Sequence, residues 1–366
     1  MRKLVGALLV AGCLVAAGVR FNQGASAVEI TDEQRSQALV DGSGAAEILL
    51  ASPGVGVPAS LSEARALLGG DALEAARAGL AARVSADPDC GAAHVLYAEV
   101  LRRVGEAALA CEHGRRGAEL LPTASRAHWV HARAIITEAA QLGKKGGMAM
   151  LAAAKRMGPY QESLRTAIEL DPTHVEARKE EVLFLLFAPM VGDVDRGTEL
   201  AGELEAIDRL EGGLCVARAL SRADDGLDAA LEKVRAVAAE FPGHQDPLWV
   251  LAEMLVGAER YAEADEALVP VLEGPRGETY YQALHMRARI CNERGLSHER
   301  ALEYLDEFTA ANPGWEWVPG RAEVLTERGR ALAGLNRVPE ARLALEAALA
   351  LDPSSKGAKA AMEALE

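Results

Sequence analysis

One spacing recurs along this chain of 366 residues: an alanine, a second packing residue four positions later, and a proline eight positions after that. A small residue lets two helices approach closely, the residue one turn later fills the groove between them, and proline cannot continue a helix. The spacing therefore predicts a series of paired helices. It occurs at Ala76, Leu80 and Pro88; Ala110, Gly114 and Pro122; Ala230, Val234 and Pro242; Ala301, Leu305 and Pro313; and Ala341, Leu345 and Pro353.

The last of these units carries the fullest pattern, and it resembles the tetratricopeptide repeat. The family pattern is W-x2-L-G-x2-Y, then A-x3-F, then P. Here aliphatic residues replace the aromatic ones and an arginine replaces the leucine, while the small residues and the proline agree. The resemblance implies an all-α fold, a right-handed α-solenoid of about eight helix-turn-helix repeats. The matching residues are Leu325-x2-Arg328-Gly329-x2-Leu332, followed by Ala341, Leu345, Ala348 and Pro353.

Carried along the chain, the resemblance implies a repeat array over residues 59–355. The third repeat is longer than the others, and the excess is an insertion at about 143–159. A short helix and a linker are expected over residues 28–58. A capping helix is expected over residues 356–366, because the open end of a stacked array needs a polar cover.

The first 27 residues have the order of an export signal. Arg2 and Lys3 precede 16 apolar residues, Leu4 to Val19, and Ala25-Ser26-Ala27 supplies small residues for cleavage. This order predicts an exported protein, periplasmic or otherwise associated with the cell envelope, that is cleaved after Ala27.

Two alternatives for the same segment stay open. Val10-Ala11-Gly12-Cys13 resembles the lipobox of bacterial lipoproteins, which implies lipidation at Cys13. A retained segment would instead anchor the chain, although 16 apolar residues are short for a bilayer span. In either case the membrane is contacted through the N-terminal segment alone.

The formal net charge of −15 narrows the classes of partner. Such acidity repels phosphate backbones and anionic headgroups, so nucleic acid is not an expected partner. A protein or peptide partner fits better.

The sequence contains no motif that indicates catalysis. It has no P-loop, G-x-G-x-x-G, G-x-S-x-G, H-E-x-x-H or EF-hand loop. The five cysteines lie far apart, and His128 and His131 share a helix face without a carboxylate or thiol at ligand spacing. We therefore expect no enzyme activity, no cofactor and no metal site.

Candidate binding residues follow from the resemblance alone. In tetratricopeptide proteins the first helix of each repeat lines a concave groove, and fixed repeat positions face the ligand. In this sequence the corresponding positions imply a partner-binding surface in which both tryptophans lie one residue away from the packing position, toward the groove. The residues are Arg102 and Arg103 in the second repeat, Arg126, Trp129 and Arg133 in the third, and Trp249 in the sixth.

These arginines and tryptophans suit a carboxylate or an acidic peptide segment, because guanidinium groups bind carboxylates in pairs of hydrogen bonds and tryptophan anchors by its area. The insertion, with its lysines and methionines, is a second candidate contact. The predicted function is a non-catalytic scaffold that holds a protein or peptide partner. Alternatives are a component associated with a solute transporter, holding a small ligand, and a factor in outer-membrane or surface-polymer assembly.

Overall fold

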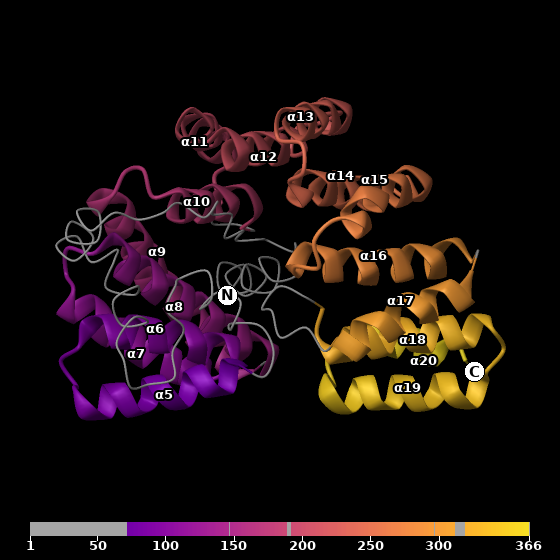
Figure 1. Cartoon of the computed structure of the whole chain (residues 1–366), viewed down its shortest axis with the longest axis horizontal. Helices are drawn as coiled ribbons and strands as arrows, with labels where there is room; N and C mark the ends of the chain where they lie inside the picture. The colour runs from indigo at the N-terminus through magenta and orange to yellow at the C-terminus, as the bar shows by residue number, and fades with distance from the viewer. Residues whose placement is uncertain (1–71, 146, 189–191, 296, 312–318, 366) are drawn as a thin grey trace. The chain divides into compact units, whose positions relative to one another are not determined.

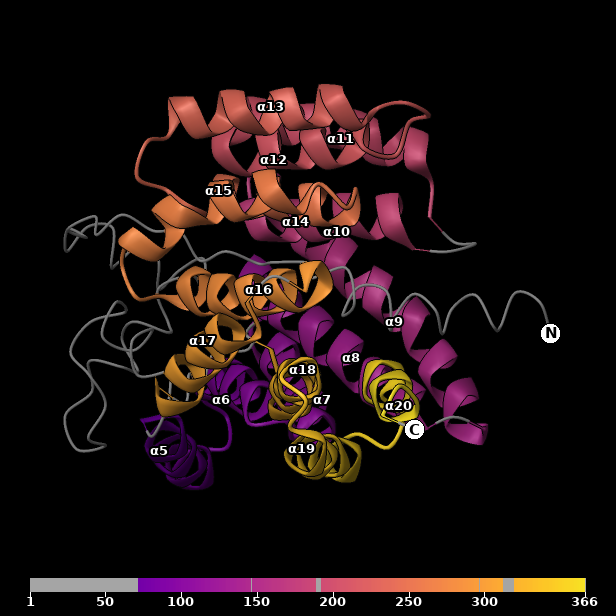
Figure 2. The same cartoon turned by 90° about the vertical axis from the view of Figure 1, so that its right-hand side faces the viewer.

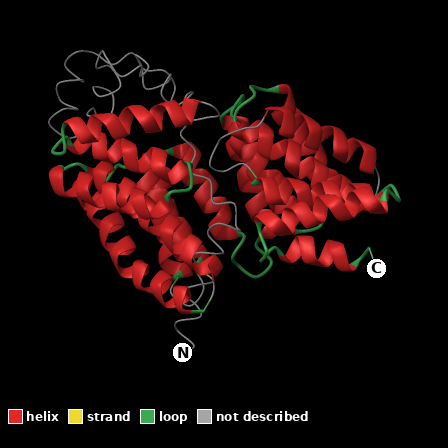
Figure 3. Ribbon diagram, turned by 90° about the horizontal axis from the view of Figure 1, so that it is seen from below, coloured by secondary structure: helices red, strands yellow, loops and turns green. Residues whose placement is uncertain are grey.

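The computed structural model describes residues 72–145, 147–188, 192–295, 297–311 and 319–365. Within these ranges the secondary structure is sixteen helices without a strand, which confirms the all-α prediction (Figure 3). The predicted signal segment, Cys13 and the segment 28–58 lie outside the described residues. Among the described helices, none combines the length and the apolar character needed to cross a membrane.

The chain divides into two compact units, the first ending at Asp224 and the second beginning at Asp225. In the first unit each helix packs against the next one along the chain (Figure 1). Its helices are α5 (Ala72–Ala86), α6 (Gly91–Arg103), α7 (Ala107–Leu120), α8 (Ser125–Lys145), α9 (Met148–Leu170), α10 (Val175–Phe187), α11 (Val194–Ile207) and α12 (Arg209–Leu220).

The second unit follows the same principle of neighbour-on-neighbour packing. Its first helices also contact one another, α14 with α16, α16 with α18, and α18 with α20. The helices are α13 (Leu227–Glu240), α14 (Gln245–Gly257), α15 (Tyr261–Glu273), α16 (Glu278–Arg294), α17 (His298–Ala311), α18 (Arg321–Gly334), α19 (Val338–Leu351) and α20 (Lys356–Glu363).

Ala110 on α7, Ala301 on α17 and Ala341 on α19 lie where the second helix of a pair meets the first. Ala110, Ala230, Ala301 and Ala341 are all fully buried, as the spacing predicts; the side chain of Ala76 is outside the described set. Gly329 on α18 shows why a small residue is needed opposite them, because a Cβ added there would lie 2.5 Å from Cγ of Leu345 on α19. Small residues on both helices therefore set the close helix–helix distance.

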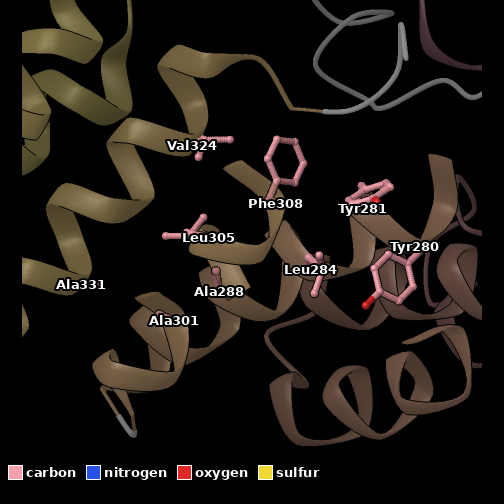
Figure 4. Packing of buried hydrophobic residues seen from close by; sticks show 9 residues of the cluster. All are labelled: Tyr280, Tyr281, Leu284, Ala288, Ala301, Leu305, Phe308, Val324 and Ala331. Atoms are coloured by element: carbon pink, nitrogen blue, oxygen red, sulfur yellow. The ribbon is translucent and has the colours of Figure 1, made fainter. Parts of the chain in front are cut away.

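The core between repeats is made of residues from three consecutive helices. In the second unit, side chains of α16, α17 and α18 meet in one cluster (Figure 4). The ring of Tyr281 stands edge-on to both Tyr280 and Phe308, with centroid distances of 5.2 and 6.1 Å. Such edge-to-face pairs add to the stabilisation that comes from burial.

The insertion becomes extra helix rather than a loop. The predicted excess at about 143–159 forms the end of α8, the turn at Gly147 and the first half of α9, so these helices contain 21 and 23 residues while the adjacent α10 has 13. Figure 2 shows α9 as the long helix of the first unit. Arg156 on α9 joins Glu138 on α8 by two hydrogen bonds of 2.7 and 2.8 Å, which fixes the pairing of the two long helices.

Candidate functional site

The first helices of successive repeats are joined by buried polar contacts. Glu99 on α6 pairs with Arg126 on α8 at 3.3 Å. The indole N–H of Trp129 on α8 donates to Glu180 on α10 at 3.1 Å. Lys179 on α10 pairs with Glu211 on α12 at 2.6 Å.

Glu99 is the centre of a group of arginines. Its carboxylate lies 3.3 Å from Nη2 of both Arg103 and Arg126. Burial by itself raises the pKa of this carboxyl, but the charges of Arg126, Arg103, Arg102 and Arg133 outweigh it and hold the pKa well below its usual range. Glu99 is therefore a carboxylate at neutral pH, surrounded by positive charge.

Trp129 lies between this group and a second carboxyl. The guanidinium of Arg133 stands 5.0 Å from the centre of the indole ring, and that of Arg126 stands 6.0 Å away. Glu180 accepts from the Trp129 indole and also from the hydroxyl of Tyr160 at 3.2 Å. Burial raises the pKa of Glu180 in spite of these donors and of the nearby arginines.

We call this set the Glu99–Glu180 cluster. Its described charged groups include four guanidinium groups and two carboxyl groups, and the charge of Arg126 also lowers the pKa of the neighbouring Glu176. Burial lowers the pKa of Arg102, and the charges of Arg133 and Arg103 lower it further. The cluster contains Glu99, Arg102, Arg103, Arg126, Trp129, Arg133, Tyr160 and Glu180.

The structure brings together the five predicted residues of the second and third repeats but corrects their expected exposure. Trp129 is only 2% exposed and Arg102 and Arg133 are also buried, whereas the sequence placed them on an open groove surface. The reason is that Trp129 gains a hydrogen bond and two stacked guanidinium groups inside the protein. Arg126 is the most exposed of the five, with 21% of its side chain exposed against 9% for Arg103.

Trp249 needs the same correction. It lies on α14 in the second unit, and it is only 6% exposed, whereas the sequence placed it on an open groove surface. In this unit the first helices are again joined by polar contacts. Thr279 donates to Asp246 at 2.9 Å, and Asn292 donates to Glu327 at 2.9 Å.

Sequence reasoning missed the acidic members of the cluster. Glu99 lies three and four residues before Arg102 and Arg103, which puts all three on one helix face, and this spacing was a usable signal. Glu180 gave no such signal, because its donors Trp129 and Tyr160 lie 51 and 20 residues earlier in the chain. The role of these residues in binding a partner remains a prediction.

Two histidines considered as metal ligands have other contacts. His128 donates from Nε2 to the carbonyl of Pro122 at 3.0 Å. His131 Nδ1 lies 3.1 Å from the hydroxyl of Ser163, and burial together with the charges of His128 and Arg115 lowers the pKa of His131 to about 4. Within the described ranges, no three histidine, cysteine or carboxylate side chains are grouped as a metal site would require.

A cavity of about 700 Å³ lies between α9 and α10. Its wall combines the apolar Phe184 and Leu185 with the charged Glu162, Arg165 and Glu181. Phe184 of this wall also packs against Tyr160 of the Glu99–Glu180 cluster, with ring centroids 5.5 Å apart. The cavity has room for a small molecule.

Comparisons with known proteins support the fold. No protein-family model and no curated protein matches the sequence. Among solved structures, yeast Tom70 is similar over 97% of this chain and 69% of its own, with 13% identity and a TM-score of 0.59. A tetratricopeptide repeat protein from Parabacteroides merdae is similar over 71% of this chain and 93% of its own, with 12% identity and a TM-score of 0.50.

A third similar structure is human IFIT1, solved as a dimer with PPP-AAAA. The similarity covers 81% of this chain and 69% of the IFIT1 chain, with 14% identity and a TM-score of 0.50. At these identities the similarity concerns the backbone arrangement and carries no information on ligands. With its paired helices and its small residues at the helix crossings, the chain has the fold of the tetratricopeptide-repeat proteins.

Proposed function

We propose that this protein is a non-catalytic scaffold that binds an acidic segment of a protein or peptide partner at the Glu99–Glu180 cluster. The observation that carries the proposal is the convergence of four guanidinium groups on α6 and α8 around two carboxyl groups. Within the described residues, the buried Nε atoms of Arg103 and Arg126 make no hydrogen bond. A buried N–H without an acceptor is costly, so an incoming carboxylate would be bound favourably there.

We expect a partner to contact the cluster first at Arg126. Its side chain is partly exposed, and it contacts both Glu99 and the face of Trp129. The buried arginines behind it add positive potential without needing to touch the ligand. Attraction of this kind weakens with salt, because exposed charges are screened beyond about 8 Å at physiological ionic strength.

The place of action is proposed from the N-terminal sequence. Arg2 and Lys3, the apolar run and Ala25-Ser26-Ala27 support export, with a periplasmic or envelope location. A role beside a solute transporter or in outer-membrane or surface-polymer assembly is the alternative. For a version that holds a small ligand, the cavity between α9 and α10 is the candidate site.

The proposal is tested with a fluorescent glutamate-rich peptide and a lysine-rich peptide of equal length, measured by anisotropy at low and at physiological salt. We expect the acidic peptide to bind and the basic one not to bind. Arg126→Ala should weaken binding by about tenfold, as for the loss of a charge-assisted hydrogen bond. Binding should also weaken as salt rises.

Arg115→Ala is the matched control, because Arg115 is an exposed arginine on α7 that pairs with Glu119. It should leave the affinity within about twofold of the wild type, the range of a surface ion pair. Equal affinity of the Arg126 variant and the wild type would place the acidic-segment site elsewhere.

A further inference from the structure

The cavity between α9 and α10 lies beside an irregular point of α9. Pro159 is inside this helix and has no N–H to donate to the carbonyl of Lys155, its partner in a regular helix. Beyond the backbone of its own helix, a Cβ added at Gly158 would meet no heavy atom within 4 Å. Both Gly158 and Pro159 line the cavity, whose volume of about 700 Å³ is within the range of about 300 to 1,000 Å³ that is usual for small-molecule sites.

Glu181 on α10 supplies a carboxyl group to the wall of this cavity. Burial raises its pKa, although the charges of Arg178 and Arg196 act in the opposite direction. Arg178 pairs with Glu203 at 3.3 Å, and Arg196 has its own partner, Glu199, at 2.9 Å. The described residues donate no hydrogen bond to the Glu181 carboxyl group. A partly buried carboxyl group of this kind is stabilised by a donor that a ligand brings.

Arg165 on α9 supplies a positive charge to the same wall. Its contact with Glu169 is 3.6 Å long, and the two side chains are 66% and 68% exposed. A surface ion pair of this kind contributes little to stability, so the guanidinium group can turn to a ligand carboxylate at small cost. Pro159 and Leu185 add apolar surface, and Glu162 adds a second, exposed carboxylate.

The wall therefore presents carboxyl groups, a guanidinium group and apolar surface to one space. A simple amine would meet a like charge at Arg165, and a simple carboxylate would meet one at Glu181. A ligand that carries an amine, a carboxylate and an apolar body matches all three features. We propose that the cavity between α9 and α10 binds a small apolar zwitterion of the dipeptide class. The acidic-segment site at Arg126 is a separate proposal, and either can fail without the other.

The test is isothermal titration calorimetry of the full chain with leucyl-leucine, N-acetyl-leucyl-leucine and leucyl-leucine amide. The free dipeptide should bind about tenfold more tightly than either blocked form, since each block removes a charge-assisted contact. Glu181→Gln should weaken binding of the free dipeptide by about tenfold and leave the affinity for the N-acetyl form unchanged. The variant should fold, because it removes a charge that burial disfavours. Arg165→Ala should weaken binding of the free dipeptide by about fivefold and leave the affinity for the amide unchanged.

Arg115→Ala is the matched control for Arg165→Ala, because Arg115 on α7 also pairs with a glutamate four residues later, Glu119, and does not line the cavity. It should bind all three ligands as the wild type does, and so should Arg126→Ala. Equal binding of the three ligands by the wild type, or no binding of any, would overturn the proposal. So would variants at Glu181 and Arg165 that change all three affinities alike or none. Loss of dipeptide binding in Arg126→Ala alone would assign the dipeptide to the Glu99–Glu180 cluster instead.

Discussion

At the residue scale, several charged side chains of the first unit are buried and pack in its interior, while others lie on its surface. Arg102 and Arg133 are buried beside Trp129, and Lys179 pairs with Glu211 at 2.6 Å where both residues are nearly covered. A buried charge is tolerated only when it is paired and hydrogen-bonded. Changes at these residues are therefore expected to affect folding as well as any binding.

Trp129 gives the first residue-scale prediction. Trp129→Ala should lower the free energy of unfolding by about 3 to 5 kcal/mol, because it leaves a cavity and removes the donor to Glu180. Trp129→Phe retains most of the volume and should cost about 1 to 3 kcal/mol, the cost of a lost hydrogen bond to a buried group. Urea denaturation measures both. A stable Trp129→Ala protein would show that the indole is not part of the core.

His131 gives a prediction on pH. Burial and neighbouring positive charge lower its pKa to about 4 in the folded protein, below its ordinary value of 6.5, so folding favours the neutral ring. The stabilisation is complete above about pH 6.5 and is lost as the pH falls from there toward 4. In urea denaturation across this range, His131→Gln should lose less stability than the wild type. An NMR titration of His131 with a midpoint near 6.5 would contradict this.

At the element scale, the helix pairs depend on small residues facing each other. Ala341 on α19 is fully buried, and Gly329 on α18 has Leu345 where its Cβ would be. A Cβ at Gly329 would lie 2.5 Å from Cγ of Leu345, so this crossing has no space for a larger side chain. Ala110, Ala230 and Ala301 are buried to the same extent as Ala341.

Ala341→Phe tests this packing. It should overpack the crossing of α18 and α19 and lower the free energy of unfolding by about 1 to 3 kcal/mol. Ala347→Phe is the control, since Ala347 lies on the exposed face of the same helix and its change should stay within about 0.5 kcal/mol. Similar denaturation midpoints for the two variants would mean that the crossing can adjust.

At the scale of the whole molecule, the hydrophobic clusters formed by the described residues join helices that are near neighbours in sequence, such as α10 to α12 or α16 to α18. A chain built this way forms its core by stacking rather than by enclosing one centre. The predicted fold follows from this local packing.

The N-terminal segment carries a prediction for the whole chain. Export followed by cleavage after Ala27 should give a mature protein that begins at Val28, because the basic residues, apolar run and small residues stand in the required order. Intact-mass measurement of the protein from the producing cell distinguishes the outcomes. A species that begins at Cys13 with added acyl mass would establish lipidation, and an uncleaved chain would indicate an anchor.

The sequence by itself determined the helical class and the repeat, because both depend on local rules. Helical periodicity, the alanine four residues before its packing partner, and the proline that stops a helix all act within about 13 residues. For this reason Ala110, Ala230, Ala301 and Ala341 were placed correctly without coordinates. The convergence of Arg126 and Trp129 with Arg102 and Arg103 followed from the repeat in the same way.

Tertiary structure alone decided which of these side chains are buried and what they contact. Trp129 donates a hydrogen bond to Glu180, which lies 51 residues later in the sequence, and Arg126 donates one to Glu99, which lies 27 residues earlier. Such pairs depend on the distance and rotation between successive first helices, which small packing differences along the array determine. A shift of a fraction of a helical turn separates a tryptophan on a groove surface from one inside the protein, and local sequence rules do not resolve that difference.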